Sequence, residues 1–131
     1  MIRSDVRCRA MNLLVGLGAL VLTEVGRHVY RPFIYRRGID DFHIADTLGN
    51  SLGTVATIFV LLAIFGRDHK SDDRIIVSAT VGTVLYELAS PLLGKPIDPW
   101  DATATIIAGG LSWLLARRLH GPGRDRIATR S

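Results

Sequence analysis

The chain has 131 residues, a net charge of +4 and 48% hydrophobic residues, and this length allows one domain at most. Its single cysteine, Cys8, excludes an intrachain disulfide and a zinc cluster built on cysteines. The charged residues are segregated along the sequence, because long uncharged runs cover residues 10–23, 47–66, 75–86 and 102–116.

These four runs predict four transmembrane helices. A helix needs about 20 apolar residues to cross a bilayer. The run 47–66 reaches this length unaided, and the other runs reach it when an acid is counted inside or at the edge. A soluble four-helix bundle, the alternative, would show a polar stripe every 3.6 residues, and residues 56–66 and 106–116 show none. We therefore expect an all-α membrane protein with a basic N-terminal tail (1–10), a transmembrane domain (11–119; helices 11–30, 44–66, 74–94 and 100–119) and a basic disordered tail (120–131).

Two short matches within the sequence indicate an internal repeat. Residues 21–25 match residues 84–88 at an offset of 63, which aligns Glu24 with Glu87. At an offset of 55, polar residues at the start of the second predicted helix align with those at the start of the fourth: His43 with Asp98, Asp46 with Asp101, Asn50 with Thr105. We therefore expect two tandem helical hairpins that enter the membrane in the same direction, as a parallel repeat; a chance match is the alternative.

The basic residues predict the orientation in the membrane. The two tails and the loop between the second and third helices hold eleven lysines and arginines, and the other two loops hold five. Basic residues concentrate in cytoplasmic segments. We therefore expect a multi-pass protein with both termini in the cytoplasm.

The acids near the outer ends of the predicted helices are the candidate binding residues. A carboxylate inside a membrane is costly when unpaired, so it usually faces the bundle interior and marks function. We expect Glu24 to pair with Asn50 and Glu87 with Thr105, each on the neighbouring helix. Purely structural helix–helix hydrogen bonds are the alternative. The ligand-binding hypothesis covers Glu24, Asp46, Asn50, Glu87, Lys95, Asp98, Asp101 and Thr105.

Metal binding and catalysis receive little support from the sequence. His43, Asp46, Asp98 and Asp101 have i, i+3 spacing at helix starts, where carboxylates stabilise the helix N-terminus, and this interpretation is favoured over a metal site. They are weak metal candidates because no metal-binding motif accompanies them. We assign no catalytic residue and no cofactor. The basic C-terminal tail suits anionic lipid headgroups better than nucleic acid.

The segment from residue 80 to residue 115 has a Glu near a helix end, a basic residue in a short loop, and then acids, a polar residue and two glycines: Glu87, Lys95, Asp98, Asp101, Thr105, Gly109 and Gly110. This pattern resembles the VanZ-like family of small bacterial integral membrane proteins, with a weaker echo at residues 46–53. The sequence departs from the family pattern at Ser90, where Gln is common, at Thr105, where Asn is common, and at Lys95, where Arg is usual. The resemblance implies a location in the inner (cytoplasmic) membrane and no defined activity.

Three functions are compatible with these features. The first is a non-catalytic membrane protein whose outward-facing acidic pocket binds a cation, a lipid headgroup or a cell-envelope precursor. The second is an accessory subunit that packs against a larger membrane protein complex. The third is an enzyme on a lipid-linked substrate with Glu87 or Asp101 as general base, which is least favoured because no nucleophile–base pair is visible. The expected partners are membrane lipids and, in the second case, a membrane complex, with no nucleic acid.

The predicted orientation can be measured with reporter fusions. A reporter fused after Ser71 or Ser131 should be cytoplasmic, and one fused after Gly38 should lie outside, because the basic residues concentrate around the first two positions. A reporter after Ser131 that lies outside the cytoplasm would contradict both the orientation and the parallel repeat.

Overall fold

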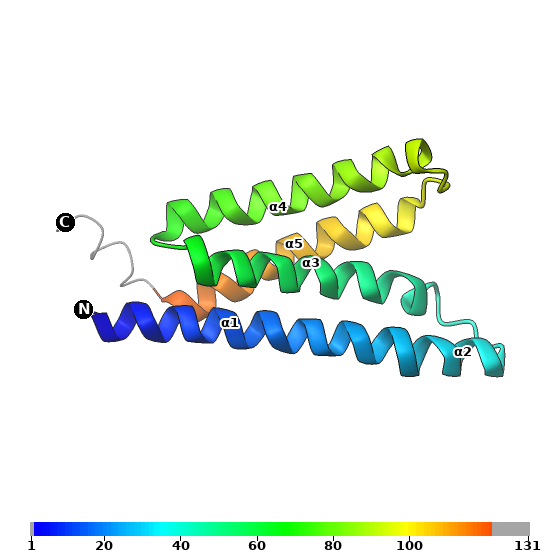
Figure 1. Cartoon of the computed structure of the whole chain (residues 1–131), viewed down its shortest axis with the longest axis horizontal. Coiled ribbons are helices and arrows are strands. Elements are labelled where there is room, and N and C mark those ends of the chain that lie inside the picture. The colour runs from blue at the N-terminus through cyan, green and yellow to red at the C-terminus, as the bar shows by residue number, and fades with distance from the viewer. Residues whose placement is uncertain (1, 122–131) are drawn as a thin grey trace.

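The computed structural model describes residues 2–121, which form helices joined by short loops, with no strand among them (Figure 1). This confirms the all-α prediction. The elements are α1 (Ile2–Val25), the π-helical turn η1 (Gly26–Tyr30), α2 (Arg31–Arg37), α3 (Ile44–Phe65), α4 (His69–Ala89), the 3-10 turn η2 (Ser90–Leu93) and α5 (Pro99–His120). The predicted disordered tail lies outside the described residues from residue 122 onward.

Three of the helical segments are long and apolar enough to cross a membrane. Within the described part of the chain these are Asp5–Arg37, Ile44–Phe65 and His69–Leu93. The prediction of membrane-spanning helices is therefore confirmed for three segments. Helix α5 (Pro99–His120) falls outside this set although it has 22 residues, because its acid, hydroxyl and glycine residues lower its mean hydropathy.

The first helix is longer at both ends than the sequence predicts. It begins at Ile2, so the region expected to be a tail is helical, and an ion pair of 3.7 Å between Asp5 and Arg9 supports the first turns. At its other end α1 leads through η1 directly into α2, so the helical segment extends past residue 30, where a loop is predicted, to Arg37. The N–H of Arg31 bonds the carbonyl of Gly26, five residues back, and this wider turn directly precedes Pro32, whose ring obstructs a regular helix.

Helix α4 begins five residues before the predicted start at residue 74. Asp68 caps its N-terminus, because the Asp68 carboxylate accepts a hydrogen bond of 2.6 Å from the Ser71 N–H. In return, the Ser71 hydroxyl oxygen accepts a hydrogen bond of 3.3 Å from the Asp68 N–H, which completes a capping box. At the other end the α-helix stops at Ala89, before the predicted end at residue 94, and residues 90–93, which include Pro91, form the 3-10 turn η2. The loop that follows ends at Asp98, the N-cap of α5.

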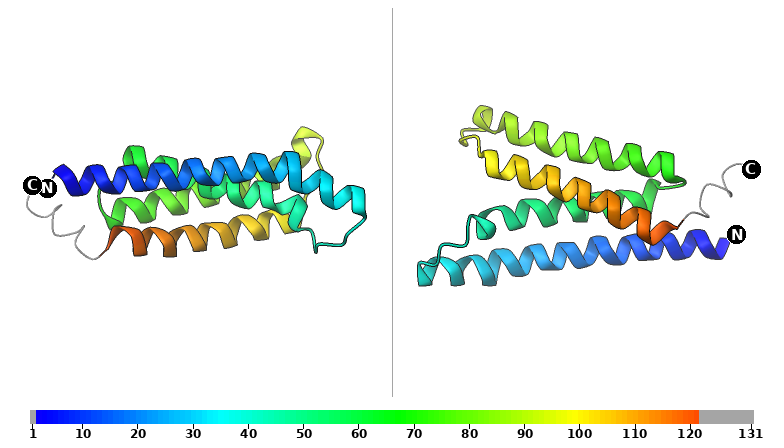
Figure 2. Two further views of the ribbon diagram at one scale, coloured as in Figure 1. Left: turned by 90° about the horizontal axis from the view of Figure 1, so that it is seen from below. Right: turned by 180° about the vertical axis from the view of Figure 1, so that it is seen from behind.

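Helix α3 is the centre of the bundle and packs on α1, α4 and α5. The buried core comprises the second half of α3 with one residue each from α4 and α5: Ile58, Phe59, Leu62, Ile76 and Ala116. Figure 1 and the right panel of Figure 2 show that α4 and α5 approach α1 and α3 where α1 begins and α5 ends, and diverge toward α2 and η2. We call the first end the closed end and the second the open end.

Glycine allows close contact between helices at three places, one of which is Gly26 of η1, where an added Cβ atom would lie 2.8 Å from Cδ2 of Leu48 on α3. A Cβ atom on Gly109 of α5 would lie 2.4 Å from Oγ1 and 2.7 Å from Cγ2 of Thr80 on α4. A Cβ atom on Gly16 of α1 would lie 3.0 Å from Cγ2 of Val60 on α3. Small residues that let helices approach are typical of helix packing in membranes.

The contact at Gly109 predicts a local effect of mutation. Gly109→Ala should lower the free energy of unfolding by about 1–3 kcal/mol, because a short β-branched side chain cannot move far from the added methyl group. Gly110→Ala is the matched control: nothing lies within 4 Å of its added Cβ, so stability should be unchanged or slightly higher. Thermal unfolding in detergent measures both. Adding Thr80→Ala to Gly109→Ala should restore stability, and equal stability of the two glycine variants would contradict the contact.

Candidate functional site

Four predicted acids lie together at the open end. Asp101, in the first turn of α5, lies within electrostatic reach of Asp46 on α3, Glu87 on α4 and Asp98 in the preceding loop. Arg31 of α2 is the cation that acts on the same carboxylate. We call Asp46, Glu87, Asp98 and Asp101 the acidic cluster. It combines residues from α3 with residues from α4, α5 and the loop between them, at the end where the α1–α3 pair and the α4–α5 pair diverge.

Asp46 is held by two residues of α2. Its Oδ1 accepts hydrogen bonds from the Tyr35 hydroxyl and from Nη2 of Arg31, the latter at 3.3 Å. On the other side, Nδ1 of His43 lies 3.8 Å from Oδ2, and the imidazole ring stacks on Trp100 with 5.5 Å between centroids. The contribution of Arg31 and Tyr35 is absent from the sequence prediction. Their i, i+4 spacing would place them on one helix face, but the segment reads as a loop.

Glu87 is joined to α3 and not to α5. Nδ2 of Asn50 donates a hydrogen bond of 3.0 Å to Oε1 of Glu87. The predicted bond between Glu87 and Thr105 is wrong, because the Thr105 hydroxyl has no partner among the described residues. Asn50 therefore connects the two pairs of helices, where the repeat predicts a bond within the first hairpin.

Glu24 lies outside the acidic cluster, which corrects its predicted pairing with Asn50. Its side chain is 49% exposed and interacts along its own helix, 3.7 Å from Nη1 of Arg27 and 3.2 Å from Nε2 of His28. The physical reason is the direction of the side chain. The neighbouring Thr23 and Gly26 are buried, and one residue along a helix turns the side chain by about 100° from the buried face.

Of the remaining predicted residues, Asp98 caps a helix and Lys95 is an exposed basic residue. Oδ1 of Asp98 accepts a hydrogen bond of 2.9 Å from the N–H of Trp100 and so caps α5, as expected for an acid at a helix start. Lys95 is exposed, its N–H bonds the carbonyl of Ser90 at 3.1 Å, and its ammonium has no ion-pair partner among residues 2–121.

Asp101 is the member of the cluster without a partner. No hydrogen bond or ion pair of the described residues satisfies its Oδ1, which is buried. The hydroxyls of Thr105, one turn further along α5, and Ser90, at the end of α4, are also buried and unsatisfied. Buried polar groups are nearly always hydrogen-bonded, so three unsatisfied oxygens in this part of the bundle require an explanation.

Thr105 also differs from the other threonines of residues 2–121. Each of the others donates its hydroxyl to the carbonyl four residues earlier: Thr23, Thr47, Thr54, Thr57, Thr80, Thr83 and Thr103. Thr105 is completely buried and does not take this bond. Its hydroxyl is therefore left without the hydrogen bond that the other threonines form.

The cluster is not a metal site of the usual kind. No group of three or more His, Cys, Asp or Glu side chains that could hold a metal ion occurs in the described part of the chain. This contradicts the weak metal alternative for His43, Asp46, Asp98 and Asp101. The reason is that Asp46 is engaged by α2 and Asp98 by the start of α5, so their carboxylates do not converge.

A second polar network, missing from the sequence prediction, joins three helices at the closed end. Nδ1 of His120 on α5 lies 2.8 Å from Oδ2 of Asp72 on α4, and Nε2 lies 2.7 Å from Oδ1 of Asn12 on α1. All three residues are buried. The sequence signal was weak because His120 and Asp72 fall in segments that read as a tail and a loop.

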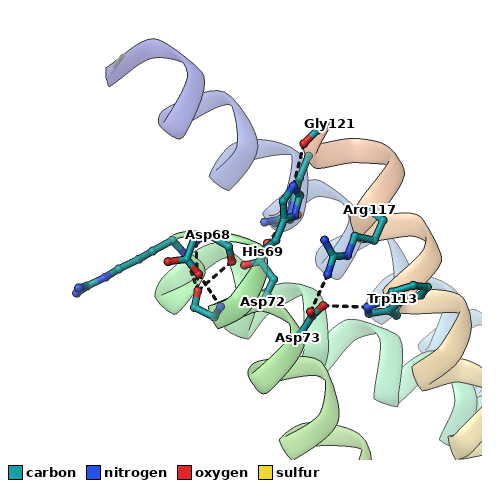
Figure 3. A network of polar contacts seen from close by, with 11 residues as sticks. Asp68, His69, Asp72, Asp73, Trp113, Arg117 and Gly121 are labelled. Carbon is teal, nitrogen blue, oxygen red and sulfur yellow. Dashed lines mark hydrogen bonds and ion pairs between the residues drawn. The ribbon is translucent and has the colours of Figure 1, made fainter. Parts of the chain in front are cut away.

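Figure 3 shows the more exposed part of this network. Asp73 accepts hydrogen bonds from Nη2 of Arg117 at 2.6 Å and from Nε1 of Trp113 at 2.8 Å, and both donors belong to α5. Nε2 of His69 lies 2.9 Å from the carbonyl oxygen of Gly121. These contacts tie the start of α4 to the end of α5.

Comparison with known proteins gives no match: no family model, no curated protein and no solved structure is similar to this chain.

The Asn50–Glu87 bond predicts an order of stability among variants. Glu87→Gln keeps a carbonyl oxygen for Asn50 and should unfold near wild type, whereas Glu87→Leu leaves the Asn50 amide unsatisfied and should lose about 0.6–2 kcal/mol. Glu24→Leu is the matched control on the repeat partner, and it should stay within about 0.5 kcal/mol because Glu24 is half exposed. Thermal unfolding in detergent gives the ranking. If Glu87→Leu is as stable as wild type, the bond does not hold the helices together.

Proposed function

We propose that this chain is a small, non-catalytic integral membrane protein of the VanZ-like type whose acidic cluster binds a positively charged group at the outer face of the membrane. The ligand class is the ammonium of a lipid headgroup or cell-envelope precursor, or an inorganic cation. The observation that carries the proposal is the buried Oδ1 of Asp101, which has no hydrogen-bond partner among the described residues and lies within electrostatic reach of Asp46, Glu87, Asp98 and Arg31.

A cation at Asp101 would remove two unfavourable features together. It would offset the repulsion among neighbouring carboxylates, and it would satisfy the buried Oδ1 of Asp101. An ammonium group carries several N–H donors, and the unsatisfied oxygens of Asp101, Thr105 and Ser90 are acceptors. The lack of a group of converging metal ligands favours an ammonium over a tightly ligated metal.

Four membrane passes with both termini in the cytoplasm give the site its outward position. Support comes from the closed end, which carries the start of α1, the α3–α4 loop and the end of α5 (Figure 1). Basic residues gather at these segments: Arg7, Arg9, Arg67, Lys70, Arg74, Arg117 and Arg118. Helix α5 also exposes large apolar side chains suited to lipid along its length: Ile106, Ile107, Leu111, Leu114 and Leu115. In this orientation the protein lies in the inner membrane with its open end outside.

The tandem repeat of two hairpins belongs to the same proposal. Asp46 and Asp101 both lie in the first turn of the second helix of a consecutive pair, as the repeat requires. Glu24 and Glu87 have different surroundings, so the two hairpins do not contribute equivalent glutamates to the proposed site.

A role as accessory subunit of a larger membrane complex is the second candidate. The observation in its favour is that two large apolar side chains at the open end are almost fully exposed, Phe42 at 83% and Leu92 at 89%. Both lie in connecting segments and not along the apolar helix faces, and such exposed side chains mark contact surfaces.

Thermal unfolding of the purified chain in detergent tests the binding proposal. Ethanolamine should raise the midpoint of unfolding in a concentration-dependent way, because a ligand at 100 times its dissociation constant stabilises the folded state by about 2.7 kcal/mol. Magnesium chloride in a parallel titration distinguishes an inorganic cation from an ammonium. Asp101→Asn should abolish the response, since the amide keeps the shape but not the charge.

Asp40→Asn is the control, because Asp40 is an exposed acid near the same end that caps a local turn through Oδ1, which the amide retains. An equal response in Asp101→Asn and wild type would contradict the site. A chain that is monodisperse only together with a membrane partner would favour the accessory role.

A further inference from the structure

A groove of about 250 Å³ lies between α3 and α4 at the closed end, away from the acidic cluster. Its walls come from the last turns of α3 and the first half of α4: Leu61, Phe65, Arg74, Ile75, Ser78 and Ala79. The walls are apolar apart from Arg74 and Ser78. The two polar residues lie one turn apart on α4, so the groove has a polar edge beside an apolar floor.

The positive charge at this edge is not compensated within the described part of the chain. The acids at the start of α4 are engaged elsewhere: Asp68 caps the helix, Asp72 faces His120, and Asp73 bonds Arg117 on α5 (Figure 3). Arg74 forms no hydrogen bond or ion pair with residues 2–121 and is exposed. Lys70, four residues earlier and also exposed, extends the positive edge toward the end of the helix.

We propose that this groove binds an anionic phospholipid of the inner leaflet, with an acyl chain along the apolar floor and the phosphate on Arg74. A guanidinium matches the geometry of phosphate oxygens with two parallel hydrogen bonds. The groove begins near the ends of α3 and α4, the level at which lipid headgroups meet a membrane protein, and basic pockets between helices on the cytoplasmic side suit anionic headgroups.

An apolar partner helix or a second copy of the chain fits the groove less well. Either would cover Arg74 with apolar side chains and leave a buried cation without a counter-charge, which is unfavourable. A lipid supplies both the apolar chain and the anion. The inference rests on the membrane location of the chain and is independent of any ligand at the acidic cluster.

Native mass spectrometry of the full chain in detergent tests the inference, with phosphatidylglycerol as the probe and phosphatidylcholine as the zwitterionic comparison. The wild type should bind phosphatidylglycerol more tightly. Arg74→Gln should weaken phosphatidylglycerol binding about fivefold, as expected for loss of one basic residue at a membrane surface. Arg118→Gln is the charge control, because Arg118 is an exposed arginine near the same end that does not line the groove.

A second pair of variants tests the groove itself. Ser78→Trp fills the groove and should abolish the preference for phosphatidylglycerol, whereas Val77→Trp adds the same bulk at an exposed position outside it and should keep the preference. Three results would overturn the inference: equal binding of both lipids by the wild type, equal losses in Arg74→Gln and Arg118→Gln, or an unchanged preference in Ser78→Trp. A wild-type dimer that Ser78→Trp converts to a monomer would assign the groove to a second copy. The ethanolamine response of the same variants is measured as well. A variant that loses the phosphatidylglycerol preference but keeps the ethanolamine response has lost the groove and not the site at Asp101.

Discussion

The buried contact of His120 with Asp72 and Asn12 is the interaction on which the arrangement of the helices depends. It joins α5, α4 and α1 at a single point around the core at the end of α3. Removing one partner of a buried hydrogen bond typically costs about 1–3 kcal/mol, because the other is left unsatisfied. The helices are thus fixed at the closed end, and their separation at the open end follows from the angles at which they leave it.

The acidic cluster is a consequence of that separation. Near the closed end, side chains from three helices meet in short polar contacts through His120, although Nδ2 of Asn12 has no hydrogen-bond partner among the described residues. At the open end the pairs diverge, and Asn50–Glu87 is the hydrogen bond that links α3 to α4 there. Asp101 and Thr105 stand on α5 with their oxygens buried and unsatisfied. A carboxylate that the fold leaves without a partner is a position at which a ligand adds stability, so the same geometry that weakens the open end makes it suitable for binding.

The apolar surface follows a different constraint. A bundle of four helices cannot bury helices that are apolar on all sides, and α1 in particular exposes Leu14 and Val21 to its surroundings. Contact between helices depends instead on small residues such as Gly16 and Gly109, which allow close approach. Many large apolar side chains thus lie on the outside of the bundle, in addition to those of the core, and this surface is suited to lipid as the surrounding medium.

The sequence by itself determined the helices and the residues at their ends. The uncharged run 47–66 predicts the second helix almost as observed, at Ile44–Phe65, and the prolines after Gly94 place the break before α5. Charge segregation and helix period are local properties, so they can be read along the chain. The tertiary structure alone decided which way each side chain faces. Glu24 and Glu87 have nearly identical sequence neighbours, yet the buried face of α1 turns Glu24 outward, while the crossing of α3 and α4 brings Asn50 to Glu87. The rotation of each helix about its own axis depends on packing against all the others, and no local pattern encodes it.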